Sequence, residues 1–181
     1  MSGHNKWSKI KHKKAATDAV KSRVFSKHAA LIAMESRKVK GLISAPSLVA
    51  AIERAKKDFM PKENIERAVA KGAGVGAAAL EEYLYEGYGP GGVAILIKAV
   101  TDNNNRTAPE IRHIFTKNGY ELGVPGSAAW AFTKTSDGYL PTAPLGIDDE
   151  TGEKLADFIE ALEEHNDVTD VYTSADSSEA E

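Results

Sequence analysis

The chain of 181 residues contains no cysteine. That absence excludes a disulfide-stapled scaffold, a cysteine-ligated zinc or iron–sulfur centre, and a cysteine nucleophile. It fits a reducing compartment, so we expect a cytoplasmic protein. Long apolar runs are also missing: Val93–Ile97, like every other apolar run of the sequence, is far shorter than the roughly 20 residues that a membrane-spanning helix needs. The N-terminal residues lack the apolar segment of a secretory signal, so we expect no membrane association.

Sequence motifs for catalysis and metal binding are absent as well. The five histidines are scattered and show no HExxH spacing, and Ser127 does not lie in a GxSxG motif. The glycines of Gly72–Ala79 resemble a dinucleotide-binding loop in spacing, but they follow a predicted helix where that loop requires a strand. We therefore expect a protein that is not an enzyme and that holds no metal and no cofactor.

The formal net charge of −3 hides a strong asymmetry between the two halves of the chain. Residues 1–71 contain 17 basic and 6 acidic residues, whereas residues 72–181 contain 6 basic and 20 acidic ones. This pattern predicts an N-terminal part that binds a polyanion, joined to a different module. In the alternative, the two halves pair with each other or the charges are merely solvated. That alternative does not explain why eight of the bases fall within the first 27 residues.

Apolar residues at helical spacing predict three helices in the basic half. The first runs from Ala15 to about Val39, with Gly41 as a stop, and the second covers residues 47–58. On the second helix Phe59 continues the inward-facing spacing. The third helix begins at Pro61 and ends at Gly72, a residue typical of helix C-termini. Together these helices predict a small bundle.

The acidic half predicts a ferredoxin-like α+β sandwich, with two helices on one face of a largely antiparallel sheet. One helix is expected after Thr107, because Thr107 and Glu110 have capping-box spacing, and the other after Asp148. Gly89–Gly92 predicts a tight turn between two strands. The expected strands are residues 83–88, 93–101, 127–134 and 168–173. The expected domains are a basic arm and helical nucleic-acid-binding domain (1–72), a linker (73–80), the α+β domain (81–174) and a disordered tail (175–181).

Basic residues of the arm and the first helix are the predicted nucleic-acid contacts. Each lysine can neutralise a phosphate and release counterions, and Trp7 can stack on an unpaired base. In the alternative, Trp7 packs against the helical bundle. Because most of the bases are lysines, the surface suits phosphate tracking better than base reading. The predicted contacts are Lys6, Trp7, Lys9, Lys11, His12, Lys13, Lys14, Lys21, Arg23 and Lys27.

A secondary contact is predicted in the polar segment Asp102–Thr107, between a strand and a helix. A helix N-terminus favours anions, so Asn103, Asn105 and Arg106 could hold a phosphate or an RNA loop. In the alternative, this segment is simply a capped connection.

The sequence contains the motifs Gly3-His4-x-Lys6-Trp7, Lys11-His12-x-Lys14-Ala15-Ala16-x-Asp18, Phe25-Ser26-Lys27, Met60-Pro61, Ile65-x-Arg67-Ala68, Tyr85 to Gly92, Asp102-Asn103-x-Asn105-Arg106-Thr107 and Gly126-Ser127. These motifs resemble those of the YebC/PmpR family, to which the mitochondrial translational activator of cytochrome oxidase subunit one also belongs. The resemblance covers residues 1–134 almost continuously, and residues 140–173 resemble the family's C-terminal helix and strand. After Lys134 the family continues into an inserted domain, whereas here Thr135–Gly138 leads at once to Tyr139. The chain thus resembles a short form without that insert, and contacts that depend on the insert are not carried over.

The resemblance implies a helical N-terminal domain followed by α+β domains. It also implies a cytoplasmic regulator, described for the family either as a DNA-binding transcription factor or as a ribosome-associated factor that eases stalled elongation. With the lysine-rich arm, it favours a non-enzymatic translation factor that binds ribosomal RNA and has the ribosome as its partner. Two alternatives remain: a transcription regulator on duplex DNA, and a scaffold whose basic half binds an acidic protein.

Overall fold

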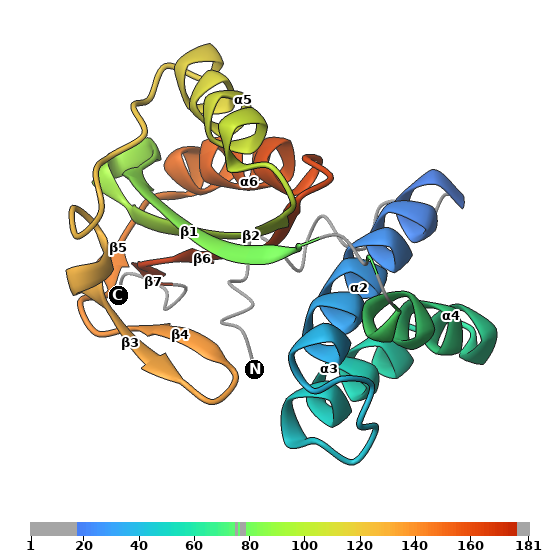
Figure 1. Cartoon of the computed structure of the whole chain (residues 1–181). Coiled ribbons are helices and arrows are strands. Elements are labelled where there is room, and N and C mark those ends of the chain that lie inside the picture. Colours follow the sequence, from blue (N-terminus) through green and yellow to red (C-terminus); the bar gives the residue numbers. More distant parts are fainter. Residues whose placement is uncertain (1–17, 75, 77–78, 177–181) are drawn as a thin grey trace. The chain divides into compact units, whose positions relative to one another are not determined.

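The computed structural model describes residues 18–74, 76 and 79–176. These residues form two compact units, which are described separately (Figure 1). The helical unit is built around residues 18–74, and the sheet unit comprises residues 84–99 and 105–176. The predicted class, a mixed α+β protein with a helical N-terminal part, is confirmed. In the described part of the chain no helix is long and apolar enough to cross a membrane.

Three helices make up the helical unit, as the apolar spacing predicts. They are α2 (Asp18–Lys38), α3 (Pro46–Lys57) and α4 (Lys62–Ala73). Gly41, with φ +77°, follows the end of α2 as expected. The helices share a core formed by the fully or almost fully buried Ile32, Leu48, Ala55, Met60, Ile65 and Ala68.

Gly72 does not end α4, contrary to the sequence-based prediction. It lies inside the helix, is buried, and faces α2. A Cβ atom built on Gly72 would lie 2.2 Å from the carbonyl oxygen of Ala33. The glycine therefore allows the two helix backbones to approach closely, which is a packing role and not a capping role.

The sheet unit is centred on a three-stranded sheet in the order β1-β2-β6. Its strands are β1 (Glu81–Tyr88), β2 (Ala94–Thr101) and β6 (Val168–Thr173), and β6 runs antiparallel to β2. The predicted turn between β1 and β2 is present as the 3-10 segment η1 (Pro90–Gly92), where Gly91 and Gly92 have φ +67° and +76°.

Helices α5 (Asn104–Lys117) and α6 (Asp149–Glu163) both cover one face of this sheet (Figure 1). Strand β2 is buried on both faces because its residues alternate. Ile95 and Ile97 pack with Phe115 and Phe158 of the helices, whereas Leu96 faces the other way. The continuous apolar run in the sequence follows from this double burial.

The other face of the sheet is covered by the chain between α5 and α6, and here the prediction of a strand over residues 127–134 is wrong. Residues Ala129–Ala131 form the 3-10 segment η2. Only β3 (Phe132–Thr135) is extended, and it pairs with β4 (Gly138–Pro141) in a separate two-stranded sheet. Ala128, Ala131 and Phe132 pack on Leu96. A parallel pair, β5 (Leu145–Gly146) with β7 (Ala175–Asp176), completes the unit.

Candidate nucleic-acid interface

Helix α2 carries the three predicted contacts that the structure describes. Asp18 lies in its first turn, where a negative charge favours the helix N-terminus, and its apolar residues turn towards α3 and α4. Lys21 is exposed, and Arg23 and Lys27 are half-buried. Arg23 and Lys27 are four residues apart and share one helix face, so their charges add along that face.

The other predicted contacts fall outside the described residues. They are the arm residues Lys6, Trp7, Lys9, Lys11, His12, Lys13 and Lys14, and the stacking role of Trp7 therefore stays a prediction.

The turn after α3 lies beside the basic helix. His28 of α2 is buried, and its Nε2 lies 2.6 Å from Oδ2 of Asp58, the residue that follows α3. The neighbours of this pair in the chain are Lys27 and Phe59. The contact therefore brings the end of α3 to the turn of α2 that carries Lys27.

Phe59 does not continue the buried face of α3, contrary to the sequence-based expectation. The helix ends at Lys57, and Phe59 has φ +61° and is 88% exposed. Helical spacing from Ala55 suggested burial, but Pro61 disfavours helical geometry at Met60, so the chain turns before Phe59 can face inwards. That proline is the sequence signal that could have revealed the exposed ring.

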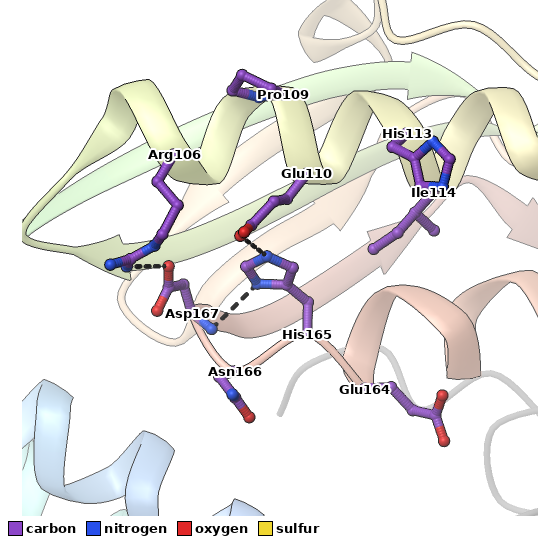
Figure 2. Close-up of a pocket in the computed structure, with 9 residues that line it drawn as sticks. All are labelled: Arg106, Pro109, Glu110, His113, Ile114, Glu164, His165, Asn166 and Asp167. Atoms are coloured by element: carbon purple, nitrogen blue, oxygen red, sulfur yellow. Dashed lines mark hydrogen bonds and ion pairs between the residues drawn. The ribbon is translucent and has the colours of Figure 1, made fainter.

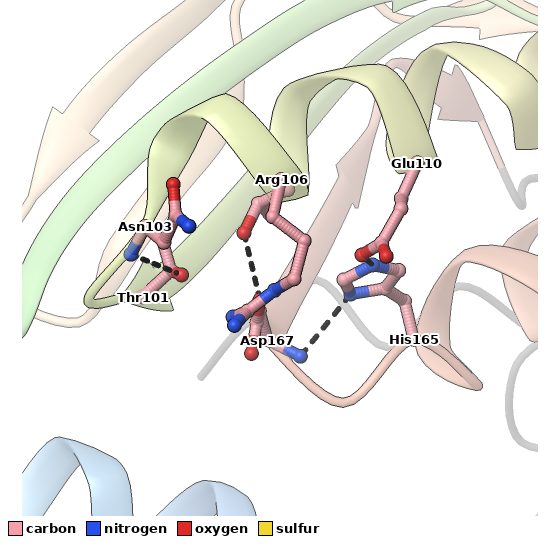
Figure 3. Close-up of polar contacts among 7 residues, drawn as sticks. Thr101, Asn103, Arg106, Glu110, His165 and Asp167 are labelled. Carbon is pink, nitrogen blue, oxygen red and sulfur yellow. Dashed lines mark hydrogen bonds and ion pairs between the residues drawn. The ribbon is translucent and has the colours of Figure 1, made fainter.

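The predicted secondary contact lies at the start of α5 (Figure 3). This helix begins at Asn104, four residues earlier than expected, so Thr107 is not its cap and Pro109 lies inside it. The backbone N–H of Asn103 donates to Oγ1 of Thr101, and Asn105 is exposed in the first turn. Arg106 donates from Nη2 to Oδ2 of Asp167 at 2.8 Å. A phosphate at this point would compete with Asp167 for the guanidinium.

Asp167 anchors a polar network between α5 and the turn before β6. Besides Arg106, its Oδ2 accepts a hydrogen bond from the hydroxyl of Thr107, which is buried. Burial acts to raise the pKa of Asp167, but the hydrogen bonds from Arg106 and Thr107 and the nearby positive charge outweigh it and lower the pKa. The network thus holds an ionised carboxylate against the first turn of α5.

The same network lines a cavity of about 810 Å³ (Figure 2). One ligand atom each from Glu110, His165 and Asp167 lie within 4.8 Å of one another, which is close enough for a metal ion. However, Nδ1 of His165 accepts a hydrogen bond from the N–H of Asp167. In the neutral ring the proton is therefore on Nε2, which lies 2.9 Å from Oε2 of Glu110. A protonated Nε2 cannot ligate a metal, so these three residues form a hydrogen-bonded cluster.

Glu86 forms a second buried polar centre, which sequence reasoning missed. Its carboxylate accepts three backbone N–H groups, from Gly126 at 2.7 Å and from Ala128 and Ala129 at 2.8 Å each. Burial acts to raise the pKa of Glu86, but the three donors together outweigh it and lower the pKa. The loop wound around this carboxylate presents Trp130, which is 64% exposed and donates from Nε1 to the hydroxyl of Tyr88.

Comparisons with known proteins cover most of the chain. The model of the TACO1/YebC protein N-terminal domain matches residues 5–75, and that of the TACO1/YebC second and third domain matches residues 80–137. The second match ends inside the β3–β4 hairpin, close to the point where the sequence departs from the family pattern.

Individual relatives agree with these matches. A probable transcriptional regulatory protein of Dictyoglomus thermophilum is 48% identical over 181 residues, which span 99% of this chain and 70% of that protein. One from Thermotoga maritima is 52% identical over 136 residues, 74% of this chain and 54% of that protein, so this match spans about half the relative's length. The crystal structure of a conserved hypothetical protein, Aq1575 from Aquifex aeolicus, aligns with a TM-score of 0.81 at 32% identity, over 96% of this chain and 98% of that one. The chain belongs to the TACO1/YebC family.

Proposed function

We propose that this protein is a non-enzymatic regulatory factor that binds ribosomal RNA, associates with the ribosome and eases stalled elongation. The observation that carries the proposal is the basic surface of α2, a helix that follows the lysine-rich residues 1–17 in the sequence. Between residues 18 and 74 the chain has twelve basic and six acidic residues, whereas residues 81–176 have six basic and eighteen acidic ones. We assign nucleic-acid binding to residues 1–72, and a spacer or protein-contacting role to residues 81–174.

The chemistry of the surface supports phosphate contacts over base reading. Lysine presents a compact, mobile charge, whereas reading a base pair in the major groove relies on bidentate arginine, asparagine or glutamine. Arg23 is the one arginine among the ten predicted contacts of arm and helix. Such a surface contacts a phosphate backbone with little sequence preference. This suits structured RNA, whose helices are recognised mainly by their shape and backbone.

The second candidate is a transcription regulator on duplex DNA. It is favoured by the name that the Dictyoglomus and Thermotoga relatives share, probable transcriptional regulatory protein. It predicts a defined operator, bound much more tightly than unrelated DNA of the same length.

Sedimentation of the tagged protein through a sucrose gradient, with and without nuclease, tests the two candidates. The RNA proposal expects co-migration with ribosomal particles that ribonuclease abolishes. A protein that stays at the top of the gradient and is enriched on DNA would contradict that proposal and favour the second candidate.

The salt dependence of RNA binding tests the surface itself. Replacing Lys21, Arg23 and Lys27 by alanine should lower the slope of log affinity against log salt by about 2, because each single-strand phosphate contact contributes about 0.7. The matched control replaces three lysines of the sheet unit, Lys117, Lys134 and Lys154, and should leave the slope unchanged. An unchanged slope in the α2 variant would refute α2 as the contact surface.

A further inference from the structure

The turn after α3 places an aromatic residue where the backbone favours glycine. The N–H of Phe59 donates to the carbonyl of Lys56, and the N–H of Met60 donates to that of Ala55, both at 3.0 Å. These two bonds form a Schellman motif, in which the residue after the helix C-cap adopts the left-handed conformation. Phe59 is that residue, with φ +61°, a conformation that is costly for any side chain with a Cβ atom.

The ring of Phe59 adds little to the packing of the residues that the structure describes. It is 88% exposed, whereas Met60, the next residue, is 6% exposed and packs in the helical core. Met60 therefore fixes the turn to the core, whereas the aromatic ring of Phe59 is exposed to solvent. Local strain and an exposed apolar ring coincide at one residue, a combination that points to a contact with a partner.

Three lysines flank Phe59 among acidic neighbours, and the turn adjoins α2. Lys56 and Lys57 precede it and Lys62 follows three residues later, all three exposed. Lys56 and Lys62 pair with Glu53 at 2.7 Å and Glu66 at 3.6 Å, contacts between exposed side chains that are weak in water and that a phosphate could displace. The contact between His28 and Asp58 brings the turn to the part of α2 that carries Lys27.

We propose that Phe59 is a stacking platform for an unpaired base of single-stranded nucleic acid, with the flanking lysines holding the adjacent phosphates. Aromatic side chains within a basic surface bind single strands in this way, because every base has a face that can stack. The proposal rests on the proposed nucleic-acid-binding function and adds to it one residue and a preference for unpaired bases.

The test uses the opposite effects that the proposal expects on stability and on binding. Phe59→Gly removes both the strain and the ring, so its melting temperature should rise. Its affinity for a short fluorescein-labelled single-stranded RNA, measured by anisotropy, should fall about 5- to 150-fold, the range for loss of one stacked base. The salt slope should not change, because stacking releases no counterions. Phe59→Trp should bind as wild type does.

Two controls separate this proposal from the function on which it rests. Leu42→Ala removes another exposed apolar side chain of the helical unit, 59% exposed, and should bind normally. If Phe59→Gly binds RNA as tightly as wild type while the α2 triple variant is weakened, the stacking role is refuted and the proposed function stands. If both variants bind RNA as tightly as wild type, both proposals are refuted for the helical unit.

Discussion

Replacing Glu86 by glutamine should destabilise the sheet unit by about 2–4 kcal/mol at neutral pH. The carboxylate accepts one N–H on Oε1 and two on Oε2, and the side chain is 6% exposed. Glutamine has a single acceptor oxygen, so its NH₂ group must face at least one of these donors. A buried donor without an acceptor costs about 1–3 kcal/mol, and the loss of charge-assisted bonds adds to that cost.

The pH dependence gives this prediction a second signature. Because folding lowers the pKa of Glu86 below its ordinary value of 4.5, the carboxylate stabilises the fold above that pH, and the stabilisation is lost as the pH falls through the folded pKa. The difference in unfolding free energy between wild type and Glu86→Gln should therefore be largest near neutral pH. It should shrink as the pH falls from 4.5 through the lowered pKa of the folded state, because the unfolded chain then binds a proton before the folded carboxylate does.

Urea unfolding followed by tryptophan fluorescence measures the effect. The chain has two tryptophans, so a Trp7→Phe background leaves Trp130, which lies in the loop around Glu86, as the only reporter. Glu121→Gln is the matched control, because it makes the same substitution at an exposed position. Equal urea midpoints for wild type and Glu86→Gln, or a difference that does not change with pH, would refute the reasoning.

Two further predictions concern Gly72 of the helical unit and Asp167 of the sheet unit. Gly72→Ala should lower the free energy of unfolding of the helical unit by about 1–3 kcal/mol, because the new methyl group meets Ala33. The melting temperature, followed by circular dichroism, should fall accordingly. The control is Gly74→Ala, whose Cβ would lie 3.4 Å from the nearest atom and which should be close to neutral. Asp167→Asn should cost about 1–3 kcal/mol at neutral pH, because it removes the charged partner of Arg106 and Thr107. Since folding lowers the pKa of Asp167 from 3.8, the melting temperatures of wild type and Asp167→Asn should converge as the pH falls below that value. A difference in melting temperature that does not change with pH would contradict the stabilising role of the ionised carboxylate.

Local sequence signals were sufficient where an element depends on its own residues. Helix α6 begins where Asp148 predicted it, with the Asp148 carboxylate accepting from the N–H of Thr151. Its apolar residues at helical spacing, Leu155, Phe158, Ile159 and Leu162, are buried. Strand β6 has the predicted bounds as well. Capping and periodicity are both properties of a short window, so a single sequence contains them.

The predictions failed where a distant residue decides the local structure. A run of apolar residues around Trp130 suggested a strand, but the N–H groups of residues 126, 128 and 129 are satisfied by Glu86, about 40 positions earlier in the chain. In the same way, Gly72 is explained by Ala33 on another helix. Nothing within a short window reveals such partners. The basic charge could be predicted from composition, whereas the exposed ring of Phe59 was missed because the spacing of α3 was extended past the turn that Pro61 signals.

The two proposals together predict different effects of Phe59→Gly on the binding of RNA and of duplex DNA. Lysines on α2 and in the α3–α4 turn attract any phosphate backbone, so charge alone does not distinguish ribosomal RNA from duplex DNA. A base that stacks on Phe59 must first be unpaired. In a duplex, extruding a base costs about a few kcal/mol, whereas loops and bulges of a structured RNA offer splayed bases at little cost. The effect of Phe59→Gly on binding should therefore be large for single-stranded RNA and small for duplex DNA of equal length. An equal loss on both would mean that the ring acts through something other than base stacking.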